Sequence, residues 1–158
     1  MRKKGYQDIR VLEYQVNELK KFFVREDGKR ADDKCIPGFE KLWIWQKAYK
    51  LMQTIHKFCK TLPNDERFKL RDQIERSSSS VCDNIAEGYS SYYYDDKVKG
   101  LNTARKEVGE TQNHIRKRTG KGYITAESVQ MWINEYEEVV RGINGFIKYI
   151  RNKKGKKC

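Results

Sequence analysis

Apolar residues recur every three or four positions along most of the chain, which is the spacing of one face of an α-helix. The clearest stripe runs from Val129 to Ile150, after a turn marked by Gly120 and Gly122 and a candidate N-cap at Thr125. The alternation of apolar and polar residues that is typical of β-strands is almost absent. The pattern therefore predicts an all-α protein.

The stripe near the C-terminus is wider than the others. A face this broad exceeds what one neighbouring helix covers, so we expect part of it to be buried between the subunits of an oligomer. Its main row consists of Val129, Trp132, Tyr136, Val139, Ile143, Phe146 and Ile150, and a second row adds Ile133, Val140 and Ile147.

The other stripes predict an amphipathic helix over residues 8–25 and bundle helices over 39–62, 63–88 and 92–118. The N-terminal helix is expected to pack against its own domain or a neighbouring subunit, with a partner-specific docking arm as the alternative.

The chain has the length of one ordinary domain, and its 158 residues can bury a core without disulfides. We expect an N-terminal helical extension and charged connector (1–38), an antiparallel four-helix bundle (39–152) and a basic tail (153–158).

The segment 63–88 carries helix signals at both ends. Pro63 cannot continue a preceding helix, and Asn64 and Asp65 are candidate N-caps. Gly88 is expected to end the helix.

Small residues inside the predicted helices suggest points where neighbouring helices approach closely. The four serines from Ser77 to Ser80 have mediocre helix propensity, so we expect them to be retained for packing. Gly100 and Gly109 are each less favourable than alanine in a helix and suggest two further contacts.

The same segment carries a recognisable motif. It resembles the small four-helix-bundle proteins encoded in intervening sequences of bacterial large-subunit rRNA genes, and the likeness covers about residues 39–150. The motif residues are Pro63, Glu66, Leu70, Gln73, Arg76, Ser77, Ser80, Val81, Asn84, Ile85, Ala86, Glu87 and Gly88, with Phe39, Leu42, Trp45, Gln46, Lys47 and Ala48 upstream and Gly122, Tyr123 and Ile124 downstream.

The resemblance implies a ring-shaped homopentamer. The same bundle is shared by the accessory variability determinant of diversity-generating retroelements, which works with a reverse transcriptase and its RNA template. An accessory role of that kind is therefore one expectation. The alternative is a structural or protein-docking module encoded by an rRNA intervening sequence, with no role in nucleic-acid binding.

Composition favours an anionic partner. The chain has 34 Lys and Arg against 22 Asp and Glu, a net charge of +12, and a pI near 9.5. RNA or DNA is the leading candidate, although positive charge also fits an anionic membrane surface or solubility alone. Without a hydrophobic signal core or a run of about 20 apolar residues, we expect a cytoplasmic protein that does not enter a membrane.

Phosphate contacts are expected from basic positions on the last two helices and the tail. Cations near a helix C-terminus are also favoured by its dipole, so part of the set could serve as caps. The expected nucleic-acid-binding residues are Arg105, Lys106, Arg116, Lys117, Arg118, Lys121, Lys148, Arg151, Lys153 and Lys154.

Residues of the family motif are expected to have structural roles. Asn84 and Glu87 adjoin the apolar stripe and are candidates for a buried hydrogen-bond network. Arg76 could join this network by pairing with Glu66 or Glu110.

The sequence contains no glycine-rich phosphate loop, nucleophile elbow or paired metal-ligand spacing. His56 and Cys59 lie one turn apart and could share a metal with Cys82, but buried core thiols are the simpler interpretation. We therefore expect a nonenzymatic protein without a metal or another cofactor.

Tyrosines cluster after Gly88, at Tyr89 and from Tyr92 to Tyr94. Adjacent side chains on a helix point about 100° apart, so these rings cannot all be core. One or two are expected to pack at a corner between helices, and exposed ones could stack on unpaired bases.

Overall fold

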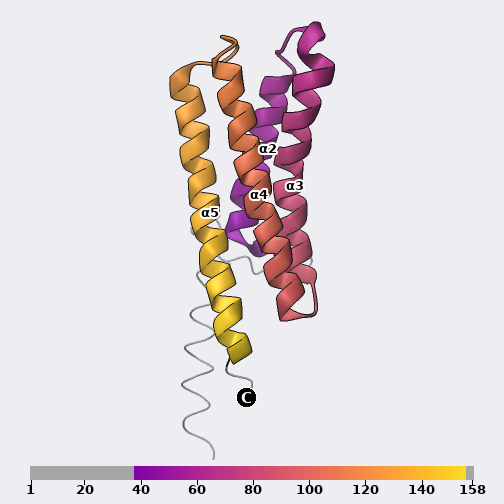
Figure 1. Cartoon of the computed structure of the whole chain (residues 1–158), viewed down its shortest axis with the longest axis vertical. Helices are drawn as coiled ribbons and strands as arrows, with labels where there is room; N and C mark the ends of the chain where they lie inside the picture. Colours follow the sequence, from indigo (N-terminus) through magenta and orange to yellow (C-terminus); the bar gives the residue numbers. More distant parts are fainter. Residues whose placement is uncertain (1–37, 156–158) are drawn as a thin grey trace, which may run out of the picture.

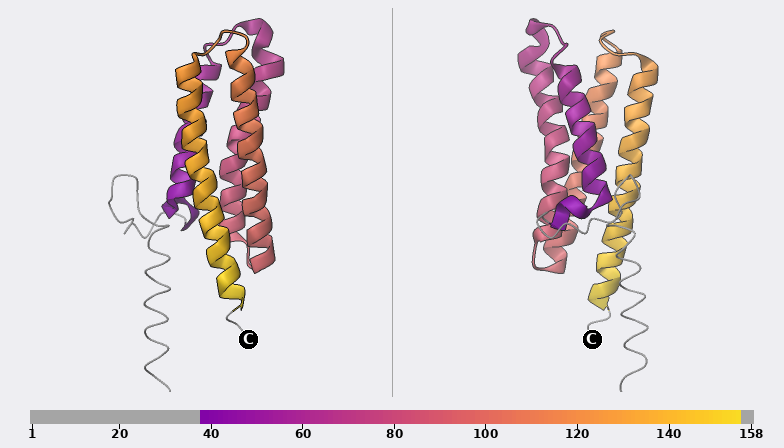
Figure 2. Two further views of the ribbon diagram at one scale, coloured as in Figure 1. Left: turned by 60° about the vertical axis from the view of Figure 1, so that its left-hand side comes forward. Right: turned by 180° about the vertical axis from the view of Figure 1, so that it is seen from behind.

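The computed structural model describes residues 38–155, apart from the side chains of residues 66–68. In this range four long helices pack side by side and alternate in direction (Figure 1). Each helix contacts two others, and α2 contacts α5, so the bundle closes on itself (Figure 2). The predicted all-α four-helix bundle is confirmed, whereas the predicted helix 8–25 lies outside the described residues. The four helices are α2 (Trp43–Cys59), α3 (Asp72–Ser90), α4 (Tyr94–Thr119) and α5 (Ala126–Gly155).

The wide apolar face of α5 is buried within the chain. Tyr136 and Ile143 have no exposed surface, and Ile147 in the second row is 5% exposed. At Gly142 the packing against α2 is so close that an added methyl group would overlap Trp43. The expectation that this face needs a second subunit is therefore wrong, because α5 lies against both α2 and α4 rather than against one neighbour.

The segment predicted as one helix over 63–88 begins with two irregular turns. A 3₁₀ turn, η2 (Asn64–Glu66), is followed by a π turn, η3 (Arg67–Arg71), before α3 starts. Gly88 does not end the helix, which continues to Ser90. The reason is that Gly88 serves a packing contact in the last turns of α3 rather than a change of backbone direction.

That contact joins α3 to α4. A Cβ added at Gly100 would lie 2.8 Å from the Cα of Gly88, so the two backbones approach more closely than side chains permit. Further along the pair, Thr111 Oγ1 donates a hydrogen bond of 2.9 Å to the buried Ser77 Oγ. Close approach at the serines and at Gly100 is confirmed. The same prediction for Gly109 is wrong, because no atom lies within 4 Å of a Cβ built there.

The helix ends also differ from the predicted ones by a few residues. A 3₁₀ turn, η1 (Gly38–Lys41), precedes α2, which ends at Cys59. The predicted cap of α5 is confirmed, since the Ser128 amide donates a hydrogen bond of 3.2 Å to Thr125 Oγ1. At its other end α5 continues to Gly155, so the helix extends into the predicted tail and projects past the α3–α4 corner (Figure 1).

Candidate nucleic-acid interface

The first group of predicted contacts lies on α4 and the turn after it. Arg105, Lys106 and Lys117 are exposed and make no ion pair with any described residue. Arg116 is also exposed, and its Nη2 donates a hydrogen bond of 3.0 Å to Gln130 Oε1. This α4 cluster consists of Arg105, Lys106, Arg116, Lys117 and Lys121.

The second group, the α5 cluster, comprises Lys148, Arg151, Lys153 and Lys154. Lys154 Nζ pairs with Asp95 Oδ1 at 2.7 Å, which links the end of α5 to the start of α4. Lys153 Nζ lies 5.1 Å from the centroid of the Tyr149 ring, in a cation–π contact. Lys148 and Arg151 are exposed, and neither forms an ion pair in the part of the chain that the structure describes.

The two clusters do not form one continuous patch. Because α4 and α5 run in opposite directions, the end of α4 and the end of α5 lie at opposite ends of the bundle (Figure 1). A helix rises about 1.5 Å per residue, so the start of α5 at Ala126 and the α5 cluster at Lys148 are roughly 33 Å apart. Arg105 and Lys106 lie between the two ends.

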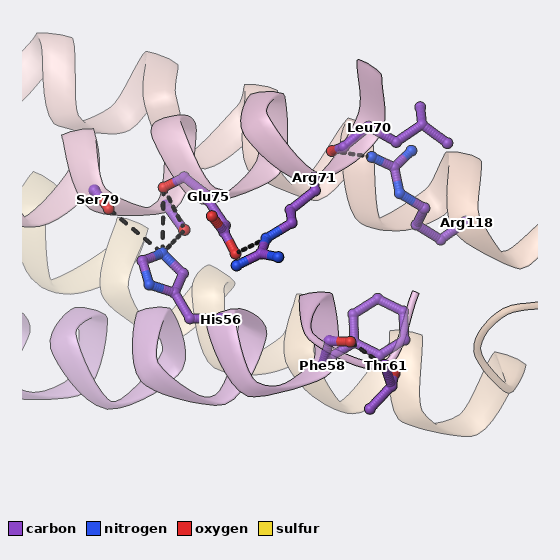
Figure 3. A network of polar contacts seen from close by, with 9 residues as sticks. His56, Phe58, Thr61, Leu70, Arg71, Glu75, Ser79 and Arg118 are labelled. Atoms are coloured by element: carbon purple, nitrogen blue, oxygen red, sulfur yellow. Dashed lines mark hydrogen bonds and ion pairs between the residues drawn. The ribbon is translucent and has the colours of Figure 1, made fainter. Parts of the chain in front are cut away.

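Arg118 does not belong to this surface. Its side chain has no exposed area, and Nη2 donates a hydrogen bond to the carbonyl of Leu70 in the π turn (Figure 3). A guanidinium in this position cannot reach a phosphate, so its predicted role in nucleic-acid binding is wrong. The helical spacing gave a signal for this, since Thr111, Ile115 and Arg118 follow one another at intervals of four and three along the inner face of α4.

A polar cluster that the sequence did not predict joins α2 to α3 (Figure 3). His56 Nε2 lies 3.3 Å from the Glu75 carbonyl oxygen and 3.4 Å from the hydroxyls of both Ser78 and Ser79. The contact of His56 with Glu75 is to the backbone carbonyl, while the Glu75 carboxylate accepts a hydrogen bond of 2.8 Å from Arg71 Nε. The cluster therefore has the arrangement of an interhelical contact rather than of a catalytic triad.

The two described cysteines are core residues. Cys59 is 1% exposed and Cys82 is 5% exposed. Burial raises the pKa of each thiol to about 12, with smaller contributions from Glu75 at Cys59 and from Asp83 at Cys82. Within residues 38–155, no three metal-ligating side chains come together. These thiols are therefore protonated at neutral pH and form part of the packing.

The predicted buried network at Asn84 and Glu87 is wrong. Glu87 is exposed, and Asn84 Nδ2 donates a local hydrogen bond of 2.8 Å to the carbonyl one turn back. Arg76 is exposed as well. Burial raises the pKa of the Glu107 carboxyl and the charge of Glu110 adds to the rise, while the nearby Arg76 opposes it. The physical reason is that these positions flank the inner face of α3 rather than lie on it.

The tyrosines near the α3–α4 corner divide as predicted. Tyr89 and Tyr94 pack against the core as partly buried residues. Tyr92 is 89% exposed and Tyr93 is 68% exposed. Both rings are among the exposed large hydrophobic side chains of the described residues, and core packing does not account for them.

These features define a small four-helix bundle with exposed cations at both ends. None of its described helices is long and apolar enough to cross a membrane. Residues 40–145 match the family described as 23S rRNA-intervening sequence protein, and the chain belongs to this family. The resemblance seen in the sequence is thereby confirmed.

One solved structure supports the same assignment. It is described as a protein with unknown function from the S23 ribosomal protein family of Bacteroides thetaiotaomicron. It is 28% identical, the match covers 66% of this chain and 95% of that chain, and the TM-score is 0.62. No curated protein matches this chain.

Proposed function

We propose that the protein is a nonenzymatic accessory protein that binds RNA or DNA through phosphate contacts. The observation that carries this proposal is that Arg105, Lys106, Lys117, Lys148 and Arg151 are exposed and lack an ion pair within residues 38–155. Cations in this state can release the counterions of a polyanion without first breaking contacts of their own. The net charge of +12 adds a long-range attraction.

Binding of this kind carries little sequence information. Phosphate contacts position a nucleic acid, whereas base edges specify its sequence. The clusters present exposed lysine and arginine side chains on helix surfaces, so the expected ligand class is broad. The neighbouring genes distinguish two biological ligands. A position inside an rRNA operon favours rRNA, whereas a neighbouring reverse transcriptase gene with a repeated template region favours the template RNA.

A homo-oligomeric ring, with a pentamer as the expected form, is part of the proposal. Its interface has to use surface other than the buried face of α5. An aromatic stack on α2 offers such surface: the ring centroids of Trp45 and Tyr49 are 4.9 Å apart, and Tyr49 is 39% exposed. Phe39 of η1 adds an edge-to-face contact with Trp45 at 5.3 Å. Sedimentation of the wild type and of Tyr49→Ser tests this assignment, and a wild type that remains a monomer at high concentration would contradict it.

The main experiment is a salt titration of nucleic-acid binding, measured by fluorescence anisotropy. The logarithm of the affinity should fall linearly with the logarithm of salt concentration, with a slope of about 0.9 per phosphate contacted on duplex DNA and about 0.7 on single strands. Replacing Arg105, Lys106 and Lys117 with glutamine should reduce that slope.

The matched control removes exposed positive charge from α2, through Lys50→Gln and Lys57→Gln. If the charges act only through the net charge of the protein, both sets of substitutions will weaken binding equally per charge. If the wild type binds neither RNA nor DNA at low salt, the proposal is wrong. The alternative, a protein-docking module that uses the aromatic stack on α2, then becomes the better interpretation.

A further inference from the structure

Tyr92 and Tyr93 form an exposed aromatic pair at the α3–α4 corner. Their ring centroids are 5.1 Å apart and their planes are perpendicular, so the edge of one ring meets the face of the other. With 89% and 68% of their surfaces exposed, both rings retain open faces. The pair adds little to the core, and its apolar surface remains available to a ligand.

The backbone around the pair is well ordered by hydrogen bonds. The Lys97 amide donates to the Tyr93 carbonyl at 3.0 Å, and Lys97 Nζ donates to the Tyr89 carbonyl at 2.5 Å. Tyr93 itself has the extended conformation that precedes the first turn of α4. The rings are therefore presented from a structured corner, which lowers the conformational entropy that a ligand must remove on binding.

Cations of the α5 cluster lie beside this corner. The pair between Lys154 and Asp95 connects the two elements directly, since Asp95 is only two residues after Tyr93. Arg151 and Lys154 also line a pocket of about 230 Å³, together with Tyr94, Asp95, Val98 and Ile150. Small-molecule sites typically measure about 300–1,000 Å³, so this hollow suits one part of a larger ligand rather than a whole one.

The local charge favours an anion. Six basic residues, Lys97, Lys99, Lys148, Arg151, Lys153 and Lys154, lie on the first turns of α4 and the last turns of α5, where Asp95 and Asp96 are the acidic ones. Lys154 already neutralises Asp95, which leaves Arg151 and Lys148 for other contacts. A phosphate is therefore best accommodated on the α5 side of the corner.

From this juxtaposition we infer that the end of the bundle formed by the α3–α4 corner and the α5 cluster binds single-stranded nucleic acid. Tyr92 and Tyr93 stack on unpaired bases, and Arg151 and Lys148 contact the adjoining phosphates. A duplex does not offer its base faces for stacking, whereas every unpaired base does, so the site selects single strands without reading sequence. This inference rests on the proposed function and adds the class of ligand and its place.

The test compares the affinity of one single-stranded oligonucleotide and its duplex for the wild type, Tyr92→Ala/Tyr93→Ala and Tyr92→Phe/Tyr93→Phe, with RNA and DNA versions of each. The alanine variant should lose about 5- to 140-fold in affinity for single strands per stacked base, while its salt slope and duplex affinity stay unchanged. The phenylalanine variant should retain wild-type binding because it keeps both rings. Arg151→Gln should instead reduce the salt slope for single strands.

Met131→Ala near the start of α5 is the matched control, since it removes another exposed large apolar side chain, 53% exposed, and should leave binding unchanged. If the wild type binds nucleic acid but the alanine variant binds single strands equally well, the single-strand site is overturned and the proposed function stands. If the wild type binds nothing at low salt, the proposed function itself fails. A change in sedimentation of the alanine variant would show that the rings contact another subunit, which also overturns the site.

Discussion

Replacing Gly100 with alanine should destabilise the protein. The new Cβ would lie 2.8 Å from the Cα and 2.9 Å from the backbone nitrogen of Gly88. Because the obstacle is backbone and not a flexible side chain, α3 and α4 would have to move apart. Such overpacking costs about 1–3 kcal/mol, and the better helix propensity of alanine returns up to about 1 kcal/mol. We expect a net loss of up to about 2 kcal/mol in the free energy of unfolding.

Gly109 provides a matched control on the same helix. It is exposed, and no atom lies within 4 Å of a Cβ built there. The same substitution should therefore show the propensity term alone and stabilise the protein by up to about 1 kcal/mol. The difference between the two variants isolates the contact between α3 and α4.

Urea and thermal unfolding followed by far-ultraviolet circular dichroism measure both effects. All variants are compared at one protein concentration, because association makes Tm depend on concentration. For a chain of this size about 1 kcal/mol corresponds to about 2–4 °C in Tm. Gly100→Ala should lower Tm, and Gly109→Ala should raise it. Equal stability of the two variants would refute the close contact on which the reasoning depends.

Three further predictions concern the core and one ion pair. Cys59 and Cys82 should resist iodoacetamide in the native protein and react after denaturation, because burial raises the pKa of each thiol to about 12. Peptide mapping measures the labelling, and rapid labelling of the native protein would contradict their burial. Arg118→Met should lower the free energy of unfolding by about 1.5–3 kcal/mol, which is the range for hydrogen bonds of charged groups. An unchanged stability in urea unfolding would contradict a stabilising role for the buried guanidinium. Lys47 lowers the pKa of Glu138 chiefly through their hydrogen bond. The pair therefore stabilises the folded state at pH values above the ordinary carboxyl pKa. This stabilisation is lost as the pH falls through the lowered pKa of Glu138 in the folded protein. Glu138→Gln should accordingly be less stable than the wild type at neutral pH and equal to it in acid, and a difference that persists in acid would point to another cause.

The bundle itself could be predicted from the sequence because each helix carries its own apolar stripe. The spacing along α5, from Val129 to Ile150, indicates which residues are buried even before the partners of the helix are known. The number of helices that cover a face is a tertiary property, however. For this reason the width of the α5 stripe predicts a second subunit, although α2 and α4 suffice to cover it.

Local irregularities were harder to predict. Nothing in the composition of residues 67–71 signals a π turn, because a shift in backbone hydrogen bonding needs no special residue. Gly88 is the kind of residue that often ends a helix, yet here its lack of a side chain allows the backbone at Gly100 to approach closely. A glycine near a helix end is equally suited to both uses, and the neighbouring helix decides between them.

The candidate site was predictable in its residue types but not in its shape. Charge alone grouped Arg118 with the exposed cations, although its position in the apolar stripe of α4 places it inside. The pairing of Lys154 with Asp95, 59 residues away, depends on how α4 and α5 align. The corner beside Tyr93 therefore becomes a candidate site only once the helices are assembled.

The opposite directions of α4 and α5 set a length scale for any bound polyanion. Along duplex DNA each strand carries a phosphate about every 3.4 Å, so the roughly 33 Å between the basic residues at the two ends of the bundle corresponds to about ten base pairs, close to one helical turn. A shorter fragment cannot contact the basic residues at both ends. A longer one can bridge both, and its second contact is then intramolecular, so affinity should rise in a step once the fragment reaches this length.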